Sequence, residues 1–327
     1  MRNSNWAIIL AGGDGSRLKP LTRFICGDDR PKQFCPIFER STLLDQARRR
    51  AQQLVRPDQV LYSLNRAHQD FYMRALVDCP AQRVVQPRNL GTAPAILSSV
   101  LAIARRDKNA TVMILPSDHH YSDVMIASET FQRAFQLAHD DRESVIVVGA
   151  SPRSAEVGYG WLELGAMVSG SDGAFHVRGL SEKPSRPAAR LLMAQGALWN
   201  TFVMAGHVSA FLEMICSALP GYLRAFEQIP GHRAPNEEVR IPDSIYERIE
   251  PADFSRQVLA AETDRLIVQR LGPVEWSDLG DCNRAADILA GFRPAPHWVA
   301  RWLQRYKNGG VQDRPAAARP AAAAAWA

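Results

Sequence analysis

The sequence predicts an α/β fold: a doubly wound, mainly parallel sheet that becomes mixed in its second half. In the first 150 residues, short apolar runs alternate with helical patterns. This alternation places helices on both faces of a parallel sheet. The first apolar run, at 6–11, leads into a glycine-rich turn. In such sheets ligands bind outside the carboxyl ends of the strands, so this turn is a candidate ligand site.

The expected elements follow from hydrophobic periodicity. In the first half, strand patterns occur at 6–11, 60–64, 83–86, 111–116 and 144–150. Helical patterns lie between them at 43–54, 67–77, 92–106 and 126–139, the first with Ser41 or Thr42 as its N-cap. After residue 158, shorter strands are expected at 160–164, 175–180, 199–205 and 266–271, and helices at 186–195, 208–218, 241–249 and 282–290.

Length and composition indicate an ordinary globular chain. Its 327 residues, 46% of them hydrophobic and 22% charged, can bury a full core. The first apolar run is too short for a signal peptide or a membrane span, and no later stretch qualifies. We therefore expect a cytoplasmic protein without membrane contact. From residue 308 onward the composition is dominated by Ala, Pro, Gly and Arg, which predicts disorder.

Charge and cysteine usage argue against two further classes. The net charge of +5 is spread along the chain, with no basic block interleaved with aromatic residues. Nucleic-acid binding is therefore not expected, and anionic small-molecule substrates account for the excess as well. The cysteines form no C-x-x-C pair, which indicates reduced, mostly structural thiols rather than a disulfide framework or a zinc site. They are Cys26, Cys35, Cys79, Cys216 and Cys282.

The turn after the first strand is suited to binding phosphate. Gly12, Gly13 and Gly15 let the main chain approach an anion closely, with free N–H groups. Arg17 and Lys32 supply positive charge nearby. The spacing matches neither the dinucleotide-binding fingerprint nor a Walker A loop. The alternative is a turn without a ligand, and the two following cations favour the phosphate interpretation.

Two motifs together carry a family resemblance. The run Gly-Gly-Asp-Gly-Ser-Arg-Leu-Lys-Pro-Leu at 12–21, followed by Pro-Lys-Gln-Phe at 31–34, resembles the sugar-1-phosphate nucleotidylyltransferases, most of all the mannose-1-phosphate guanylyltransferases. The resemblance implies a Rossmann-like nucleotidyltransferase (GT-A-like) fold. It also implies a catalytic domain at 1–294, with a nucleotide half at about 1–157 and a sugar-phosphate half at about 158–294, and an extension at 295–327. Lys19 departs from the tryptophan common at its position.

The resemblance assigns catalytic and metal-binding roles. Arg17 would clasp the β- and γ-phosphates of the nucleotide, and Lys32 would stabilise the α-phosphate in the transition state. Asp118, after the strand at 111–116, and Asp278, in Trp-Ser-Asp-Leu-Gly-Asp, would bind Mg²⁺, and Mn²⁺ would serve similar ligands. From the residues alone, Asp118 could instead close a strand and Asp278 could cap a helix.

The resemblance also assigns the binding residues. The segment 86–96 looks like the base-reading segment of the family, with Thr92 as a plausible helix N-cap and Pro94 in the first turn. The expected nucleotide-binding residues are Leu10, Ala11, Gly12, Gly13, Gly15, Ser16, Arg17, Asn89, Gly91, Thr92 and Pro94. The expected sugar-phosphate-binding residues are Gly160, Glu163, Glu182, Lys183 and Asn200. For Glu163 the alternative is an acidic residue on an edge strand.

The resemblance implies an enzyme that transfers a guanylyl group from GTP to mannose 1-phosphate. The products would be GDP-mannose and pyrophosphate, formed by Mg-assisted in-line attack on the α-phosphate. The expected partners are GTP and mannose 1-phosphate, with a homodimer as one option for the assembly. One alternative keeps this chemistry with another hexose 1-phosphate or nucleoside triphosphate. The other is a catalytically silent regulatory protein that binds nucleotide sugars on the same fold.

Overall fold

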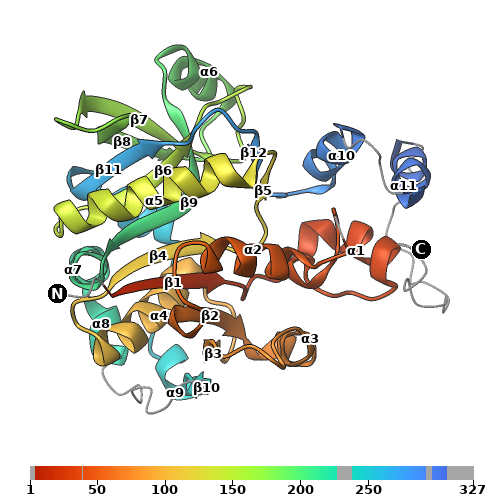
Figure 1. Ribbon diagram of the computed structural model, residues 1–327, viewed down its shortest axis with the longest axis horizontal. Helices are drawn as coiled ribbons and strands as arrows, with labels where there is room; N and C mark the ends of the chain where they lie inside the picture. The colour runs from red at the N-terminus through yellow and green to blue at the C-terminus, as the bar shows by residue number, and fades with distance from the viewer. Residues whose placement is uncertain (1–3, 39, 227–237, 292–296, 308–327) are drawn as a thin grey trace.

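The computed structural model describes residues 4–38, 40–226, 238–291 and 297–307 (Figure 1). Within these residues, ten strands form one mixed sheet in the order β10-β3-β2-β1-β4-β9-β6-β11-β8-β7, so the predicted fold class is confirmed. The first five in this order pair in parallel and the other half is mainly antiparallel. The strands of the sheet are β1 (Asn5–Leu10), β2 (Val60–Asn65), β3 (Gln82–Gln86), β4 (Thr111–Pro116), β6 (Val145–Ala150), β7 (Gly160–Met167), β8 (Ala174–Glu182), β9 (Leu198–His207), β10 (Glu238–Arg240) and β11 (Leu266–Arg270).

Successive side chains of the central strands enter two different cores, as strand periodicity requires. In β1, Trp6 and Ile8 belong to one buried cluster, and Ala7 and Ile9 belong to the other. Figure 1 shows helices on both faces of the sheet. The first core includes side chains from α4 (Thr92–Arg106), α7 (Val208–Ala218), α8 (Pro220–Phe226) and α9 (Asp243–Tyr246). The second includes side chains from α2 (Leu43–Gln52), α3 (Gln69–Ala75), α5 (Val124–Asp140) and α6 (Arg186–Ala194).

A third buried cluster lies outside the sheet, where α1 (Lys19–Cys26) packs near α10 (Cys282–Gly291) and α11 (His297–Lys307) (Figure 1). Leu18, Leu279 and Trp302 are buried in it. The rings of Phe24 and Trp298 meet at 6.3 Å between centroids. This cluster joins the segment that follows the glycine turn to the segment that carries Asp278.

Short one-turn helices complete the connections. Two of them matter for the site: η1 (Ser16–Leu18) precedes α1, and η2 (Lys32–Phe34) carries Lys32. Others are η3 (Pro57–Gln59), η4 (Arg66–His68), η6 (Thr263–Arg265) and the π-helical turn η5 (Ser255–Leu259). The strands β5 (His120–Tyr121) and β12 (Trp276–Ser277) form a separate antiparallel pair.

The structure corrects several expected elements. The helix expected at 241–249 is only the single turn α9. The expected N-cap of α2 is confirmed: the Thr42 side chain accepts the Asp45 N–H, and the Asp45 side chain accepts the Thr42 N–H. Thr92 was expected to cap α4, but Gly91 holds that position and Thr92 is the first helical residue. The Thr92 hydroxyl accepts the Phe254 N–H. Helices α1, α8 and α11 were not predicted. The disorder expected from residue 308 lies outside the described residues. None of the described helices is long and apolar enough to cross a bilayer.

Candidate functional site

A cavity of about 480 Å³ lies at the carboxyl ends of the parallel strands. β1 and β4 are parallel neighbours, with Leu10 beside Pro116, so the chain leaves both strands at one edge of the sheet. The glycine turn follows β1 and Asp118 follows β4 at this edge. Most of the predicted site residues line the cavity: Leu10, Gly12, Gly13, Gly15, Ser16, Arg17, Lys32, Asn89, Gly91, Thr92, Asp118, Gly160, Glu182, Lys183, Asn200 and Asp278.

Three predicted residues do not line the cavity. Ala11 is buried in the second core, and Pro94 is buried in α4. Glu163 lies on β7 and pairs with Arg178 of β8 at 3.1 Å. Successive side chains of a strand point to opposite faces of the sheet. Gly160 faces the cavity from the same strand, so Glu163, an odd number of positions further along, lies on the other face.

Gln33 links the glycine turn to the Lys32 turn. Its buried side-chain amide donates to the carbonyls of Ala11 at 3.0 Å and Gly13 at 2.8 Å. Gly15 has a φ of +58°, and a Cβ there would lie 3.0 Å from the Lys32 backbone nitrogen. The glycine is therefore required both for its backbone conformation and for close approach. Sequence reasoning missed Gln33, although its place directly after Lys32 could have suggested it.

Lys32 reaches both predicted metal ligands. Its Nζ lies 2.8 Å from Asp118 Oδ2 and donates to the carbonyls of Asp278 at 3.1 Å and Leu279 at 2.9 Å. Burial tends to raise the pKa of Asp118, but the Lys32 ammonium and His119 lower that pKa below its ordinary value. The carboxylate is therefore ionised at neutral pH.

The pairing of β5 with β12 brings the Asp278 segment beside Asp118. Trp276 lies opposite Tyr121, and Ser277 lies opposite His120. The Trp276 indole N–H donates to His119 Nδ1 at 3.2 Å across this pair. Two segments far apart in the sequence therefore meet at the cavity through a short ladder that sequence reasoning did not predict.

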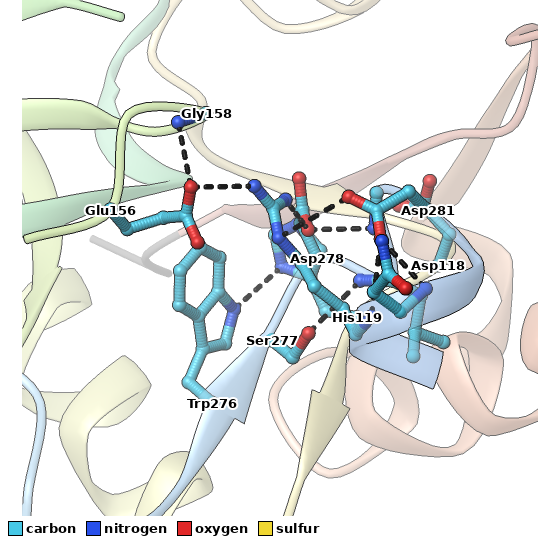
Figure 2. Close-up of polar contacts among 12 residues, drawn as sticks. Asp118, His119, Glu156, Gly158, Trp276, Ser277, Asp278 and Asp281 are labelled. Carbon is cyan, nitrogen blue, oxygen red and sulfur yellow. Dashed lines mark hydrogen bonds and ion pairs between the residues drawn. The ribbon is translucent and has the colours of Figure 1, made fainter. Parts of the chain in front are cut away.

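Arg284 on α10 is a site residue that sequence reasoning missed. Its guanidinium donates to Asp278 Oδ1 at 2.7 Å, lies 3.3 Å from Glu156 and stacks 4.2 Å above the Tyr159 ring centroid. The guanidinium therefore bridges the Glu156 and Asp278 carboxylates, which are both labelled in Figure 2. The Gly280 N–H donates to the same Asp278 oxygen at 2.7 Å. Burial works against the charge, but Asp278 and Tyr159 raise the pKa of Arg284.

Two glycines make room for this guanidinium. A Cβ on Gly158 would lie 2.1 Å from Arg284 Nη2, and a Cβ on Gly280 would lie 2.4 Å from Nη1. Real Cβ atoms do not approach other heavy atoms so closely. Both glycines line the cavity, so their small size fits the position of Arg284. This contact could not be read from spacing, because Gly158 and Arg284 lie in distant segments.

The opposite wall contains the predicted sugar-phosphate residues. Gly160 lies between Glu182 and Asn200 in the sheet register. A Cβ on Gly160 would lie 2.6 Å from a Glu182 carboxylate oxygen. Burial raises the pKa of Glu182, and Lys183, whose Nζ is 3.3 Å away, offsets this only in part.

Backbone strain is concentrated at the cavity. Among the described residues, the non-glycine residues with positive φ are Lys183 at +51°, Phe202 at +61° and Leu279 at +48°. Lys183 and Phe202 line the cavity, and Leu279 stands between Asp278 and Gly280, which also line it. Such conformations cost roughly 1–3 kcal/mol each and cluster at functional sites. Phe202 was not predicted, and a bulky residue in this conformation gives no sequence pattern.

The predicted base-reading segment is held by a second loop. Gly91 has a φ of +94°, and a Cβ there would lie 2.3 Å from the Ala252 carbonyl oxygen. The same carbonyl accepts the Ala93 N–H at 3.1 Å, and the Ala252 N–H donates to Leu90. The loop at 252–254 also brings Asp253 to the cavity, followed by Ser255. Ser255 thus lies at the site but offers a hydroxyl and no carboxylate.

The donor set fits a magnesium ion only together with a substrate. In the described parts of the chain, no three His, Cys, Asp or Glu side chains converge as a metal cluster. Mg²⁺ is commonly bound by one or two carboxylates plus substrate phosphates and water. Asp118 and Asp278 at one cavity match that arrangement in number and in ligand chemistry.

Comparisons with known proteins give one consistent result. The profile of the "Nucleotidyl transferase" family matches residues 6–290. The mannose-1-phosphate guanylyltransferase of Escherichia coli is 26% identical over 288 residues, which is 86% of this chain and 59% of that protein. The xanthan biosynthesis protein XanB of Xanthomonas campestris pv. campestris (strain B100) is 26% identical, over 86% of this chain and 58% of that protein.

A solved structure agrees with these matches. The crystal structure of a protein described as a mannose-1-phosphate geranyltransferase, from Thermus thermophilus, superposes with a TM-score of 0.76 at 26% identity. It covers 90% of this chain and 81% of that one. The present chain therefore spans less than two thirds of the curated relatives but most of this solved relative.

Proposed function

This chain belongs to the nucleotidyl transferase family, and on that premise we propose that it joins a nucleoside triphosphate to a sugar 1-phosphate and releases pyrophosphate. The specific reaction we propose is guanylyl transfer from GTP to mannose 1-phosphate, which gives GDP-mannose. The E. coli relative, which is named a mannose-1-phosphate guanylyltransferase, supports this choice. A different hexose phosphate or base is the second candidate, because the identity is only 26%.

The observation that carries the proposal is the distribution of charge around one cavity. Arg17 and Lys32 lie on the glycine-turn side, and Lys183 lies on the opposite wall. Two polyanionic substrates repel each other, so a site that brings them together must supply cations from both sides. The lining supplies such cations, and Asp118 and Asp278, which also line the cavity, would add the positive charge of a bound metal ion.

The proposed step is a displacement at the α-phosphorus. A phosphate oxygen of the sugar phosphate forms a bond to that phosphorus, and the bond to the bridging oxygen breaks with pyrophosphate as the leaving group. Backbone N–H groups of the glycine turn and the Arg17 guanidinium would hold the departing phosphates. Lys32 would stabilise the charge that develops on the α-phosphoryl oxygens.

The acceptor is oriented from the other wall. Lys183 would neutralise its phosphate, and Glu182 and Asn200 would bind hydroxyl groups of the sugar. Asp118 and Asp278 would hold Mg²⁺, which when bound supplies positive charge that neutralises the phosphates. The pairing of Lys32 with Asp118 would hold the lysine side chain near the reacting phosphate.

Pyrophosphate release tests the proposal. The purified protein is incubated with Mg²⁺, mannose 1-phosphate and each nucleoside triphosphate in turn, and the nucleotide sugar is identified by mass spectrometry. GDP-mannose formed only with GTP is the expected result. Release with another base or another hexose phosphate would keep the chemistry and overturn the specificity. Binding of GDP-mannose without turnover of any pair would favour the regulatory alternative.

A further inference from the structure

Two cysteines next to the Lys32 turn are in contact. Cys26 is the last residue of α1, and Cys35 directly follows the turn η2. Their sulfur atoms lie 3.3 Å apart, and both residues are free thiols. A disulfide bond is about 2.05 Å long, so the two atoms need to approach by only about 1 Å to become bonded. Sequence spacing gave no sign of this pair.

The two thiols have different environments. Cys26 is half-buried and Cys35 is fully buried. The hydrogen bond from the Cys35 thiol lowers the pKa of Cys26, against the effect of burial, and the nearby Arg30 lowers it further. Burial raises the pKa of the Cys35 thiol well above its usual range. The thiolate is the reactive form of cysteine, so Cys26 is the nucleophile and Cys35 is the neutral partner.

We propose that Cys26 and Cys35 form a peroxide-responsive disulfide that controls the position of Lys32. In the first step the Cys26 thiolate attacks hydrogen peroxide: an S–O bond forms, the O–O bond breaks and hydroxide leaves. In the second step Cys35, losing its proton, attacks the Cys26 sulfenic acid. The S–S bond forms, the S–O bond breaks, and the hydroxide that leaves becomes water with that proton. In total, two thiols and one peroxide give one disulfide and two waters.

The cross-link acts on the turn that holds the catalytic lysine. The Cys35 N–H donates to the Lys32 carbonyl at 3.0 Å, and the Cys35 carbonyl accepts from Leu43 at 3.3 Å. Lys32 is meanwhile held at its other end by Asp118 and by the carbonyls of Asp278 and Leu279. Movement of Cys35 toward Cys26 therefore displaces the backbone of Lys32 while its ammonium group stays tethered. A displacement of about 1 Å can lower a rate by up to about 10²-fold.

Formation of the disulfide is independent of the proposed reaction, and only its effect on turnover rests on it. The experiment treats the full chain with hydrogen peroxide and compares it with the same sample after dithiothreitol. We expect a disulfide between the tryptic peptides 24–32 and 33–40 and the loss of two thiols per chain. We also expect nucleotidyl transfer to fall about tenfold or more and to recover on reduction. If the linked peptides do not form, the proposal is wrong.

Variants separate the parts of the proposal. Cys26→Ser is expected to give no linked peptide and no reversible loss of turnover. Cys216→Ser, which removes an exposed thiol elsewhere, is the matched control and should respond as the wild type does. In Cys35→Ala, dimedone should label Cys26 as the trapped sulfenic acid. Dimedone labelling confined to Cys216 would contradict the assignment of Cys26 as the nucleophile. A disulfide that forms in an active enzyme without any change in turnover would contradict the coupling to Lys32.

Discussion

Arg284 donates a 2.7 Å hydrogen bond to Asp278, and the same guanidinium lies over the ring of Tyr159. One carboxylate oxygen of a proposed metal ligand is therefore held by a cation that also contacts the Glu156 loop. The orientation of Asp278 depends on α10 and on the segment that follows β6, not only on its own loop.

The first prediction concerns this contact. Arg284→Ala should raise the Mg²⁺ concentration needed for half-maximal activity by roughly 10- to 100-fold, because residues that orient a metal ligand have effects of this size. Arg284→Lys should recover part of the loss, since it keeps a donor near Asp278. Pyrophosphate release is measured against Mg²⁺ concentration, with thermal unfolding recorded in parallel.

Asp118→Asn is the reference for loss of a ligand, and Arg178→Ala, on the far side of β8, is the control. A lower unfolding temperature with unchanged Mg²⁺ dependence would show that Arg284 acts on stability alone.

The second prediction distinguishes the two walls of the cavity. Lys32→Ala should lower kcat by about 10²–10³-fold, the usual cost of removing a donor from the reacting group. Lys183→Ala should mainly raise the KM for the sugar phosphate, because in its proposed role that side chain would contact the acceptor in the ground state as well. Steady-state kinetics with both substrates varied would check this. Equal effects of both substitutions on kcat would show that the assigned roles are wrong.

The third prediction follows from the raised pKa of Glu182. In its proposed role, an ionised Glu182 would accept hydrogen bonds from the sugar, so the KM for the sugar phosphate should rise on acidification, with a midpoint above the ordinary value of about 4.3. The substrate phosphate also titrates, but it does so equally for every variant. In Glu182→Gln the KM for the sugar phosphate should therefore no longer rise at the pH where Glu182 is protonated. Glu213→Gln, which changes a surface residue paired with Arg265, should keep the wild-type pH dependence.

The same shift makes a prediction for stability. The folded pKa of Glu182 lies above its unfolded value, so ionisation in the folded state costs stability, and this cost appears as the pH rises through the folded pKa. Relative to the wild type, Glu182→Gln should gain stability at neutral pH and not below about pH 4. Urea unfolding at the two pH values measures the difference. If Glu182→Gln gained the same stability at both pH values, the gain would come from packing and not from the removed charge.

The fourth prediction concerns the left-handed backbone of Phe202. At ordinary positions alanine is more stable than glycine by about 0.4–1 kcal/mol. At residue 202 the order should reverse, with Phe202→Gly more stable than Phe202→Ala by roughly 1 kcal/mol, because glycine adopts positive φ without strain. Both variants lose the contact with the Phe254 ring, so the comparison isolates the backbone. The same two substitutions at Phe175, on β8, should show the ordinary order.

The sequence predicted the regular part of the fold well. The strand at 111–116 and the helices at 92–106 and 208–218 have the predicted bounds, because their apolar periodicity coincides with burial in the sheet cores. The helix α1 was missed because its first residues, Lys19 to Leu21, belong to the glycine-rich motif, and no element was assigned to the residues that follow. The turn α9 starts two residues later than the expected helix, because Pro242 holds its N-cap position.

The site was predictable to the extent that its residues stand in linear motifs. Arg284 depends on how distant segments meet, the Cys26–Cys35 contact depends on the path of the loop between the two residues, and Phe202 depends on a strained backbone. Glu163 was expected at the sugar on the basis of its motif, yet it points away from the cavity beside Arg178. A role of Glu163 in binding stays a prediction.

The third core has a consequence for the shortest chain that can hold the site. The boundary expected at residue 294 separates α11 from the rest, yet Trp298, Val299 and Trp302 of that helix are buried with Leu18, Leu21 and Ile25. A fragment that stops at 294 would expose these apolar side chains to water beneath both the Arg17 turn and the Asp278 segment. We therefore expect a fragment that ends at 307, and so keeps α11, to preserve the site better than one that ends at 294.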